Sequence, residues 1–177
     1  MVAYCIILKL FIMNNANLIM SNANREMVFE RVFNAPAELV FEAWTNPDHL
    51  ARWYGPDGFT LTTYHMDVKP GGTWRFTMHG PDGRDYHNLV TFTEVIRPQR
   101  LVYKQTDDTD TERVNFETTV TFEGRGDKTA LTMHMLFATA AELERVAREH
   151  GAVEGAHQTL ARLAVLLAGF VGAGEDR

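Results

Sequence analysis

The sequence predicts a single α+β domain: a strongly curved antiparallel sheet of about seven strands, two short helices after strand one, and a long C-terminal helix across the concavity. Three observations predict it. Short runs of β-branched and aromatic residues alternate with Pro- and Gly-containing turns over residues 59–137. Apolar residues recur at three- and four-residue steps over residues 153–170, as on one face of a helix. Two helix-start patterns, at Pro36 and at residues 46–48, follow the first strand.

The N-terminal elements follow from breaks in the apolar pattern. Residues 27–33 alternate well enough to form a strand, which Asn34 to Pro36 ends. Pro36 then begins a short helix, because its fixed φ suits the first turn. A second short helix begins at residues 46–48 and ends at residues 55–58. The apolar residues of the two helices are Leu39, Val40, Ala43, Trp44, Leu50, Trp53 and Tyr54.

Six further strands are expected, and tight turns join most of them. Residues 80–83 have Pro second and Gly fourth, which suits a type I turn closing a hairpin, and residues 124–127 join the last two strands. Short strands joined in this way indicate an antiparallel sheet. The predicted strands are 59–68, 73–79, 85–96, 100–106, 114–123 and 128–137.

The C-terminal region is predicted to be helical. Thr139 and Glu142 form a capping box, and Gly151 is expected to kink the region. The apolar stripe that follows predicts a helix of about 16 residues, roughly 24 Å long. A sheet and one helix cannot fill all the space between them, so we expect a cavity there. The stripe comprises Val153, His157, Leu160, Leu163 or Ala164, Leu167 and Phe170.

Composition excludes several classes of function. A formal net charge of −6 without a basic stripe argues against nucleic-acid binding and against anionic membrane surfaces. The single cysteine, Cys5, excludes an intrachain disulfide and suits a reducing cytoplasm. The seven histidines show no metal-ligand spacing, and no covalent catalyst, phosphate loop or dinucleotide fingerprint is present. We therefore expect no cofactor and no metal.

Residues 1–25 are predicted to be an extension of the main domain, which covers residues 26–172 and is followed by a flexible tail at 173–177. Residues 2–13 are apolar but shorter than the roughly 20 residues that a membrane span needs. Three interpretations stay open for residues 1–19: an upstream extension with the natural start at Met20, an added edge strand or oligomer contact, or a targeting segment. If translated, the apolar segment should pack, against its own domain or across a homodimer interface.

The candidate ligand-binding residues are those expected to line the cavity, although each ring could equally be ordinary core. His87 and His157 could contact a ligand head group or act as a base, but a histidine satisfied by its neighbours is the simpler interpretation. Glu94 is expected to face solvent. The candidates are Trp53, Tyr54, Trp74, Phe76, His87, Phe92, Tyr103, Phe116, His157 and Leu160.

Four segments carry a resemblance to a known family: FNAPAELVFEAW, WTNPDHLARWYGPDGF, KPGGTWRFTMHGPDGR and EGAHQTLARLAVLL. Together they resemble the family named for the activator of the heat-shock protein 90 ATPase, over residues 26–170. The resemblance implies the START-like, helix-grip fold, with Trp53 and Tyr54 near the cavity mouth. The chaperone activators carry a large additional N-terminal domain that has no counterpart here, which disfavours a chaperone partner.

Three functions are compatible with these observations. The first is a cytoplasmic binding protein for a small hydrophobic or amphipathic molecule held between sheet and helix. The second is a START-like enzyme of the cyclase, hydrolase or dehydratase kind, which would use His87, His157 or Tyr103 as acid or base. The third is a chaperone-associated or dimerising accessory protein that works through the outer face of its sheet. The sequence names neither the ligand nor a reaction.

Overall fold

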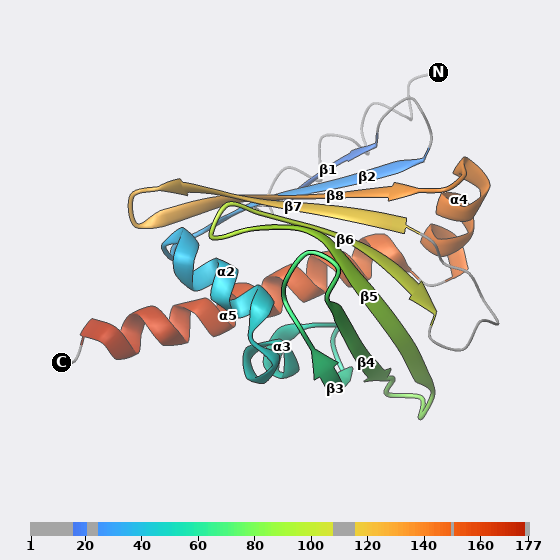
Figure 1. The fold of residues 1–177 in the computed structure, drawn as a ribbon, viewed down its shortest axis with the longest axis horizontal. Coiled ribbons are helices and arrows are strands. Elements are labelled where there is room, and N and C mark those ends of the chain that lie inside the picture. Colours follow the sequence, from blue (N-terminus) through green and yellow to red (C-terminus); the bar gives the residue numbers. More distant parts are fainter. Residues whose placement is uncertain (1–15, 21–24, 108–115, 150, 176–177) are drawn as a thin grey trace, which may run out of the picture.

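The computed structural model describes residues 16–20, 25–107, 116–149 and 151–175, and its strands form one antiparallel sheet (Figure 1). The sheet order is β1-β2-β8-β7-β6-β5-β4-β3. The strands are β1 (Ala16–Met20), β2 (Glu26–Phe33), β3 (Thr60–Met66), β4 (Thr73–His79), β5 (Asp85–Ile96), β6 (Arg100–Asp107), β7 (Phe116–Arg125) and β8 (Lys128–Phe137). The helices are α2 (Ala37–Thr45), α3 (Pro47–Trp53), α4 (Ala140–Glu149) and α5 (Ala152–Glu175).

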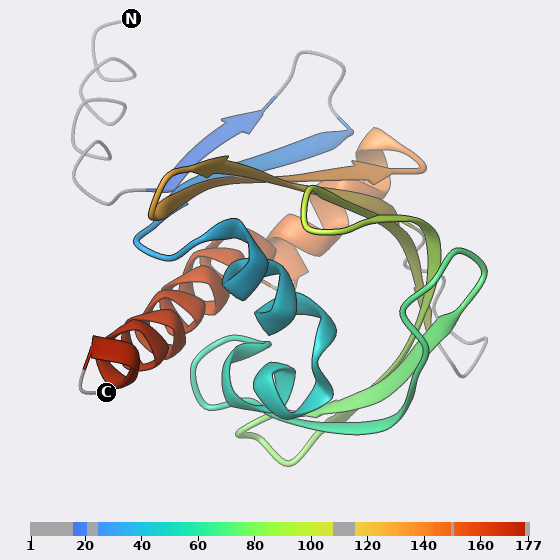
Figure 2. The same ribbon diagram turned by 60° about the vertical axis from the view of Figure 1, so that its left-hand side comes forward.

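The strand order explains how the helices reach one side of the sheet. The chain leaves β2, runs through α2 and α3 to the opposite edge, and returns strand by strand from β3 to β8, which pairs with β2. Figure 2 shows the sheet curling around α5, with α2 and α3 on the same side. The predicted α+β architecture, with its seven strands as β2 to β8, is therefore confirmed. β1 adds an eighth strand at the edge, paired with β2.

The turns form where the sequence predicts them. Gly83 has φ +80° in the β4–β5 turn, and Gly126 has φ +68° in the β7–β8 turn. A positive φ is sterically unfavourable for residues that carry a Cβ atom. Glycine has no Cβ and adopts it readily. Glycine at these positions thus fixes the registers of the two hairpins, in which His79 pairs with Asp85 and Arg125 with Lys128.

The two short helices are set by the predicted start patterns. The backbone of Pro36 precedes α2 in an extended conformation, and the side chain of Asn46 caps α3 by accepting a hydrogen bond from the Asp48 amide at 2.9 Å. Trp53 ends α3 fully buried, and its indole Nε1 donates to the Ala43 carbonyl at 2.9 Å. That bond ties α3 to α2 and satisfies the only polar atom of the ring.

The C-terminal helices also begin as predicted, but the second is longer. The Thr139 hydroxyl accepts a hydrogen bond from the Glu142 amide at 3.1 Å, and Gly151, at φ +56°, separates α4 from α5. α5 has 24 residues rather than about 16 and continues through Glu175, so the first three residues of the predicted tail are helical. Its fully or almost fully buried residues are Leu160, Leu163, Leu166 and Leu167.

The domain core lies between α5 and the concave side of the sheet, called here the inner face. Successive side chains of a strand point to opposite sides, so Trp74 and Phe76 face inward from β4 while Arg75 faces outward. On the next strand Phe92 faces inward, and Glu94, after a register shift, is half exposed and pairs with Arg100 at 2.8 Å. The prediction that Glu94 faces solvent is thus confirmed.

Within the described residues, one helix is long and apolar enough to cross a membrane by length and composition: α5, over Ala152–Ala173, with mean hydropathy 1.3. Its buried leucines pack into the domain core. The N-terminal residues 2–13, for which packing is predicted, lie outside the described residues.

Candidate functional site

Aromatic rings from α2, α3 and β4 gather at one end of the inner face. The ring of Trp53 lies 4.9 Å from that of Trp44, and Tyr54 lies 5.0 Å from Trp74, each in an edge-to-face arrangement. Trp74 and Phe76 stack with their centroids 3.9 Å apart. The structure therefore brings four of the predicted candidates together, as a packed aromatic cluster: Trp53, Tyr54, Trp74 and Phe76.

Two tyrosine hydroxyls lie inside this apolar environment. Tyr103 of β6 packs against Phe92 at 6.1 Å, and its phenol shares a hydrogen bond with Tyr54. Burial raises the pKa of Tyr54 to about 12, although the bond to Tyr103 works in the opposite direction. Burial also raises the pKa of Tyr103 well above its usual value, and the neighbouring Tyr54 adds to this. Both hydroxyls are neutral at neutral pH, so they can donate a proton but cannot act as a base.

Other buried polar atoms lack a regular hydrogen bond. The Thr118 hydroxyl of β7 lies beside the Tyr103 phenol and lowers its pKa, but makes no bond of ordinary geometry. Nε2 of His157 on α5 has no partner among the described residues, and its ring packs edge-on against Phe29 at 5.5 Å. Trp44 Nε1 and His49 Nδ1 are unpaired in the same way on the side of α2 and α3. Such atoms are uncommon in folded interiors, and each needs an explanation.

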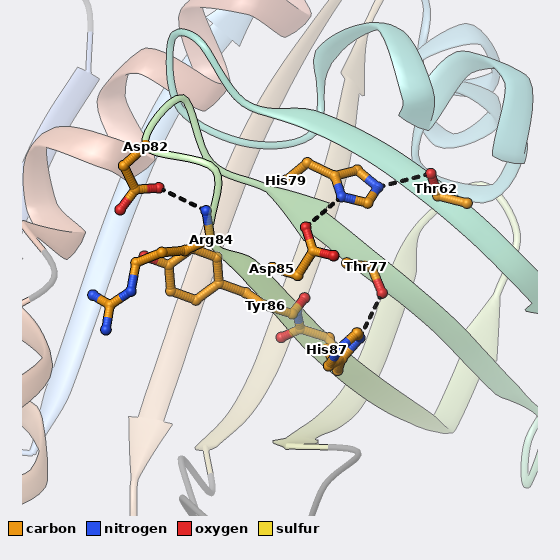
Figure 3. Close-up of polar contacts among 9 residues, drawn as sticks. Thr62, Thr77, His79, Asp82, Arg84, Asp85, Tyr86 and His87 are labelled. Atoms are coloured by element: carbon orange, nitrogen blue, oxygen red, sulfur yellow. Dashed lines mark hydrogen bonds and ion pairs between the residues drawn. The ribbon is translucent and has the colours of Figure 1, made fainter.

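The remaining candidates are more dispersed. Leu160 is buried on α5, where it belongs to the core between helix and sheet. Phe116 is half-buried at the start of β7 and packs against Phe137 at 5.2 Å. His87 is exposed on the outer face, where Nδ1 bonds the Thr77 hydroxyl at 2.8 Å (Figure 3). The structure therefore does not bring His87 together with the other candidates.

A separate polar network beside the Thr77–His87 pair crosses three strands of the outer face (Figure 3). His79 of β4 bonds Asp85 of β5 through Nδ1 at 2.7 Å and Thr62 of β3 through Nε2 at 2.9 Å. A hydroxyl, an imidazole and a carboxylate in this order can activate a nucleophile. Here, however, the Asp85 carboxylate is about half exposed, with 52% of its side-chain surface accessible, and the network lies on a solvated sheet face. Its evident role is to link the edge strand to its neighbours.

Two hollows of about 420 Å³ each open at the surface rather than in the centre of the inner face. One lies between α3 and α5 and includes Arg52, Arg162 and Val165. The other lies at the end of β6 to β8 and includes Lys104 and Phe116. Phe116 is the one predicted candidate among their lining residues. No three of His, Cys, Asp and Glu gather closely enough to hold a metal ion in the part of the chain that the structure describes.

Arg162 of α5 holds the loop that follows α3 against the helix. Its Nη1 donates to the carbonyls of Gly55 and Pro56, each at 2.8 Å, and to that of Phe59 at 3.2 Å. Gln158, one turn earlier on α5, accepts from the Asp57 amide at 3.1 Å. We call these contacts the loop latch. Sequence reasoning missed it, because its acceptors are backbone atoms that no residue type announces.

Comparison with known proteins agrees with this geometry. The profile described as "Activator of Hsp90 ATPase homolog 1-like protein" matches residues 34–168. No curated protein matches the chain. A protein from Arthrobacter aurescens, solved by NMR, is similar with a TM-score of 0.81 and 22% identity, over 88% of this chain and 92% of that one. Protein Ms6760 from Mycobacterium smegmatis has a TM-score of 0.77 and 24% identity, over 85% and 95% of the two chains.

A third solved structure carries the family's name. The AHSA1 protein from Silicibacter pomeroyi has a TM-score of 0.66 and 22% identity, over 81% of this chain and 97% of that one. Identities this low establish a common fold and nothing finer. The profile, by contrast, covers well over half of the chain. The chain therefore belongs to the Activator of Hsp90 ATPase homolog 1-like family, with the START-like, helix-grip fold that its sequence resembles.

Proposed function

We propose that this protein is a cytoplasmic binding protein for a small hydrophobic or amphipathic molecule, held between the inner face and α5. One observation carries the proposal: two buried polar atoms between the inner face and α5, Thr118 Oγ1 and His157 Nε2, make no regular hydrogen bond in a mainly apolar core. An unpaired polar atom in such a place costs about 1–3 kcal/mol. A ligand with a hydroxyl or carbonyl group would offset that cost while its apolar part packs on the rings.

Access to this site requires movement, because aromatic rings fill much of the inner face. The loop latch is the expected point of movement, since Arg162 and Gln158 connect the loop after α3 to α5 through the hydrogen bonds described above. Release of these bonds would separate Tyr54 from the helix side of the core. Ligand exchange is therefore expected to depend on how firmly Arg162 holds this loop.

The experiment compares two threonines that differ in one respect. Thr118 and Thr129 are both almost fully buried, but the Thr129 hydroxyl donates to the Ala35 carbonyl at 2.7 Å. Thr118→Val should leave the melting temperature unchanged or raise it, because it removes an unsatisfied hydroxyl, and should weaken ligand binding. Thr129→Val should lower the melting temperature without a specific effect on binding. The measurement is native mass spectrometry of protein from its own host, for co-purified small molecules.

Two results would contradict the proposal. The first is the absence of any co-purified molecule in repeated preparations, together with no thermal shift from a panel of lipids, aromatics and isoprenoids. The second is a Thr118→Val protein that loses stability and keeps its ligand, since the hydroxyl would then serve the fold alone.

An enzyme of the cyclase, hydrolase or dehydratase kind is the second candidate, favoured by the position of the Tyr54 and Tyr103 phenols within the mainly apolar core. A buried neutral phenol can protonate a bound substrate. Turnover of a co-purified molecule that Tyr103→Phe abolishes, with binding retained, would support this candidate over simple binding. Unchanged turnover in that variant would count against it.

A further inference from the structure

Arg31 is a charged residue among the apolar residues of the inner face. Side chains of β2 alternate between the two sides of the sheet, and Met27, Phe29 and Phe33 are all buried on one of them. Arg31 has the same parity and is only partly exposed. Because Phe29 contacts His157 of α5, this side of β2 is the one that faces the helix.

The surroundings of Arg31 are apolar. Its partner in β8 is Leu131, which is 1% exposed, and its guanidinium lies over the Phe33 ring, 5.6 Å from the centroid. Burial alone lowers the pKa of Arg31, with no carboxylate raising it. An arginine in such a setting normally has an acidic partner, since a desolvated charge is otherwise unfavourable.

Among the residues that the structure describes, none supplies such a partner. Arg31 makes no ion pair with any residue that the structure describes. On its other side it pairs with Ala16 of β1, and the sequence has no aspartate or glutamate before Glu26. Glu30, the next residue along β2, is exposed on the opposite side of the sheet. The contact with Phe33 offsets part of the cost of burial but does not neutralise the charge.

We propose that Arg31 binds the acidic head group of an amphipathic ligand, whose apolar part lies along the inner face. The inference rests on the proposed function and narrows it to molecules with a carboxylate, sulfonate or similar anion. A guanidinium presents a planar fork of donors, which matches such a group with two parallel hydrogen bonds. The unpaired charge in the described structure and the apolar neighbours are then two parts of one site.

The test uses two probes that share their aromatic rings and differ in charge. N-phenyl-1-naphthylamine is neutral, and 1-anilinonaphthalene-8-sulfonate carries a sulfonate on the same skeleton. Both fluoresce more strongly in apolar sites, so titration gives a dissociation constant for each. Arg31→Gln should weaken sulfonate binding by about 10-fold or more, the loss expected for charge-assisted hydrogen bonds. Binding of the neutral probe should change by less than about 2-fold.

Two further variants control for net charge and for folding. Arg84→Gln removes an equal charge from an exposed residue at the β4–β5 turn and should affect neither probe. Arg31→Lys keeps the charge but loses the planar fork, so it should bind the sulfonate with intermediate affinity. If Arg31→Gln fails to fold, Arg31→Lys becomes the test. It should then bind the sulfonate probe more weakly than the unaltered protein and the neutral probe equally well.

The outcomes separate the two proposals. If the neutral probe binds but the sulfonate binds no better, or if Arg31→Gln weakens both probes equally, Arg31 does not recognise an anion and only this inference is overturned. If neither probe binds the unaltered protein, the proposed function is contradicted and the inference with it. Selective loss of the sulfonate in Arg31→Gln, with Arg84→Gln unaffected, supports both.

Discussion

The contribution of the loop latch to stability can be tested with Arg162→Met, which keeps the apolar stem of the side chain and removes its hydrogen-bond donors. Arg162 Nη1 contacts three carbonyls, those of Gly55, Pro56 and Phe59. One nitrogen carries two hydrogens, so the equivalent of two charge-assisted bonds is lost, each worth about 1.5–3 kcal/mol. Partial solvent access reduces this. We expect a loss of about 2–4 kcal/mol in the free energy of unfolding, and a melting temperature lower by about 5–15 °C.

The assay is urea unfolding followed by tryptophan fluorescence, since Trp53 ends the helix that precedes the latched loop. Arg148→Met is the matched control, because Arg148 also forms a charged contact, at 2.6 Å to Glu144, but is 77% exposed. Arg148→Met should lose no more than about 0.5 kcal/mol in the free energy of unfolding, as is usual for surface ion pairs on a helix. If Arg162→Met and Arg148→Met show equally small losses in the free energy of unfolding, water satisfies the three carbonyls and the latch does not stabilise the loop.

Three further predictions concern the core, pH and the backbone. Leu163→Ala should cost about 2–5 kcal/mol in chemical unfolding because the side chain is fully buried, whereas Val165→Ala, on the same helix but 75% exposed, should cost less than about 0.5 kcal/mol. The pKa of Tyr54 is about 12 in the folded protein and about 10 in an unfolded chain, so its stabilising effect is complete below about pH 10 and is lost as the pH rises towards about 12. In urea unfolding across this range, the free energy of unfolding should fall less steeply with pH in Tyr54→Phe than in the unaltered protein. Gly55→Ala, at φ +119° with a methionine methyl 3.1 Å from the new Cβ, should lower the melting temperature more than Gly83→Ala, at φ +80° with no atom within 4 Å.

Much of the fold was predictable because its turns and helix caps depend on neighbouring residues in the sequence. The turn at residues 80–83 and the cap at Thr139 are read from neighbouring residues, and the structure places both as expected. The length of α5 was underestimated, because the pattern over residues 153–170 has no stop signal and the glycines beyond it do not end the helix. Helix propensity alone does not set such an end when the preceding turns already pack on the domain.

The candidate site was predictable only in part, because strand parity decides which face a residue joins. Phe92 and Asn88 of β5 both face inward, whereas His87 has the opposite parity and faces outward. Since His87 is an odd number of residues from Phe92 with no bulge between them, the alternation itself excluded it from the inner face. Parity also placed Arg31 with Phe29 and Phe33, so this residue could have been found from the sequence.

Other residues of the site could not be found from the sequence. Thr118 matters because its buried hydroxyl makes no regular hydrogen bond, and a missing hydrogen bond depends on the positions of all neighbouring atoms. Arg162 matters through backbone carbonyls of a loop more than 100 positions away, with separations of 103 to 107 residues. Neither feature produces a pattern of residue types that could be recognised in the sequence.

Three irregularities of the inner face support one interpretation. Thr118 has a buried hydroxyl without a regular bond, His157 has a buried ring nitrogen without a partner, and Arg31 has a partly desolvated charge without a carboxylate. A buried hydroxyl or ring nitrogen without a regular hydrogen bond adds little to the stability of the fold, and a partly desolvated charge without a carboxylate is unfavourable. Positions where a sequence departs from the requirements of its own core are expected at functional sites. The ligand proposed above, with a polar group and an acidic end, would offer a partner to all three.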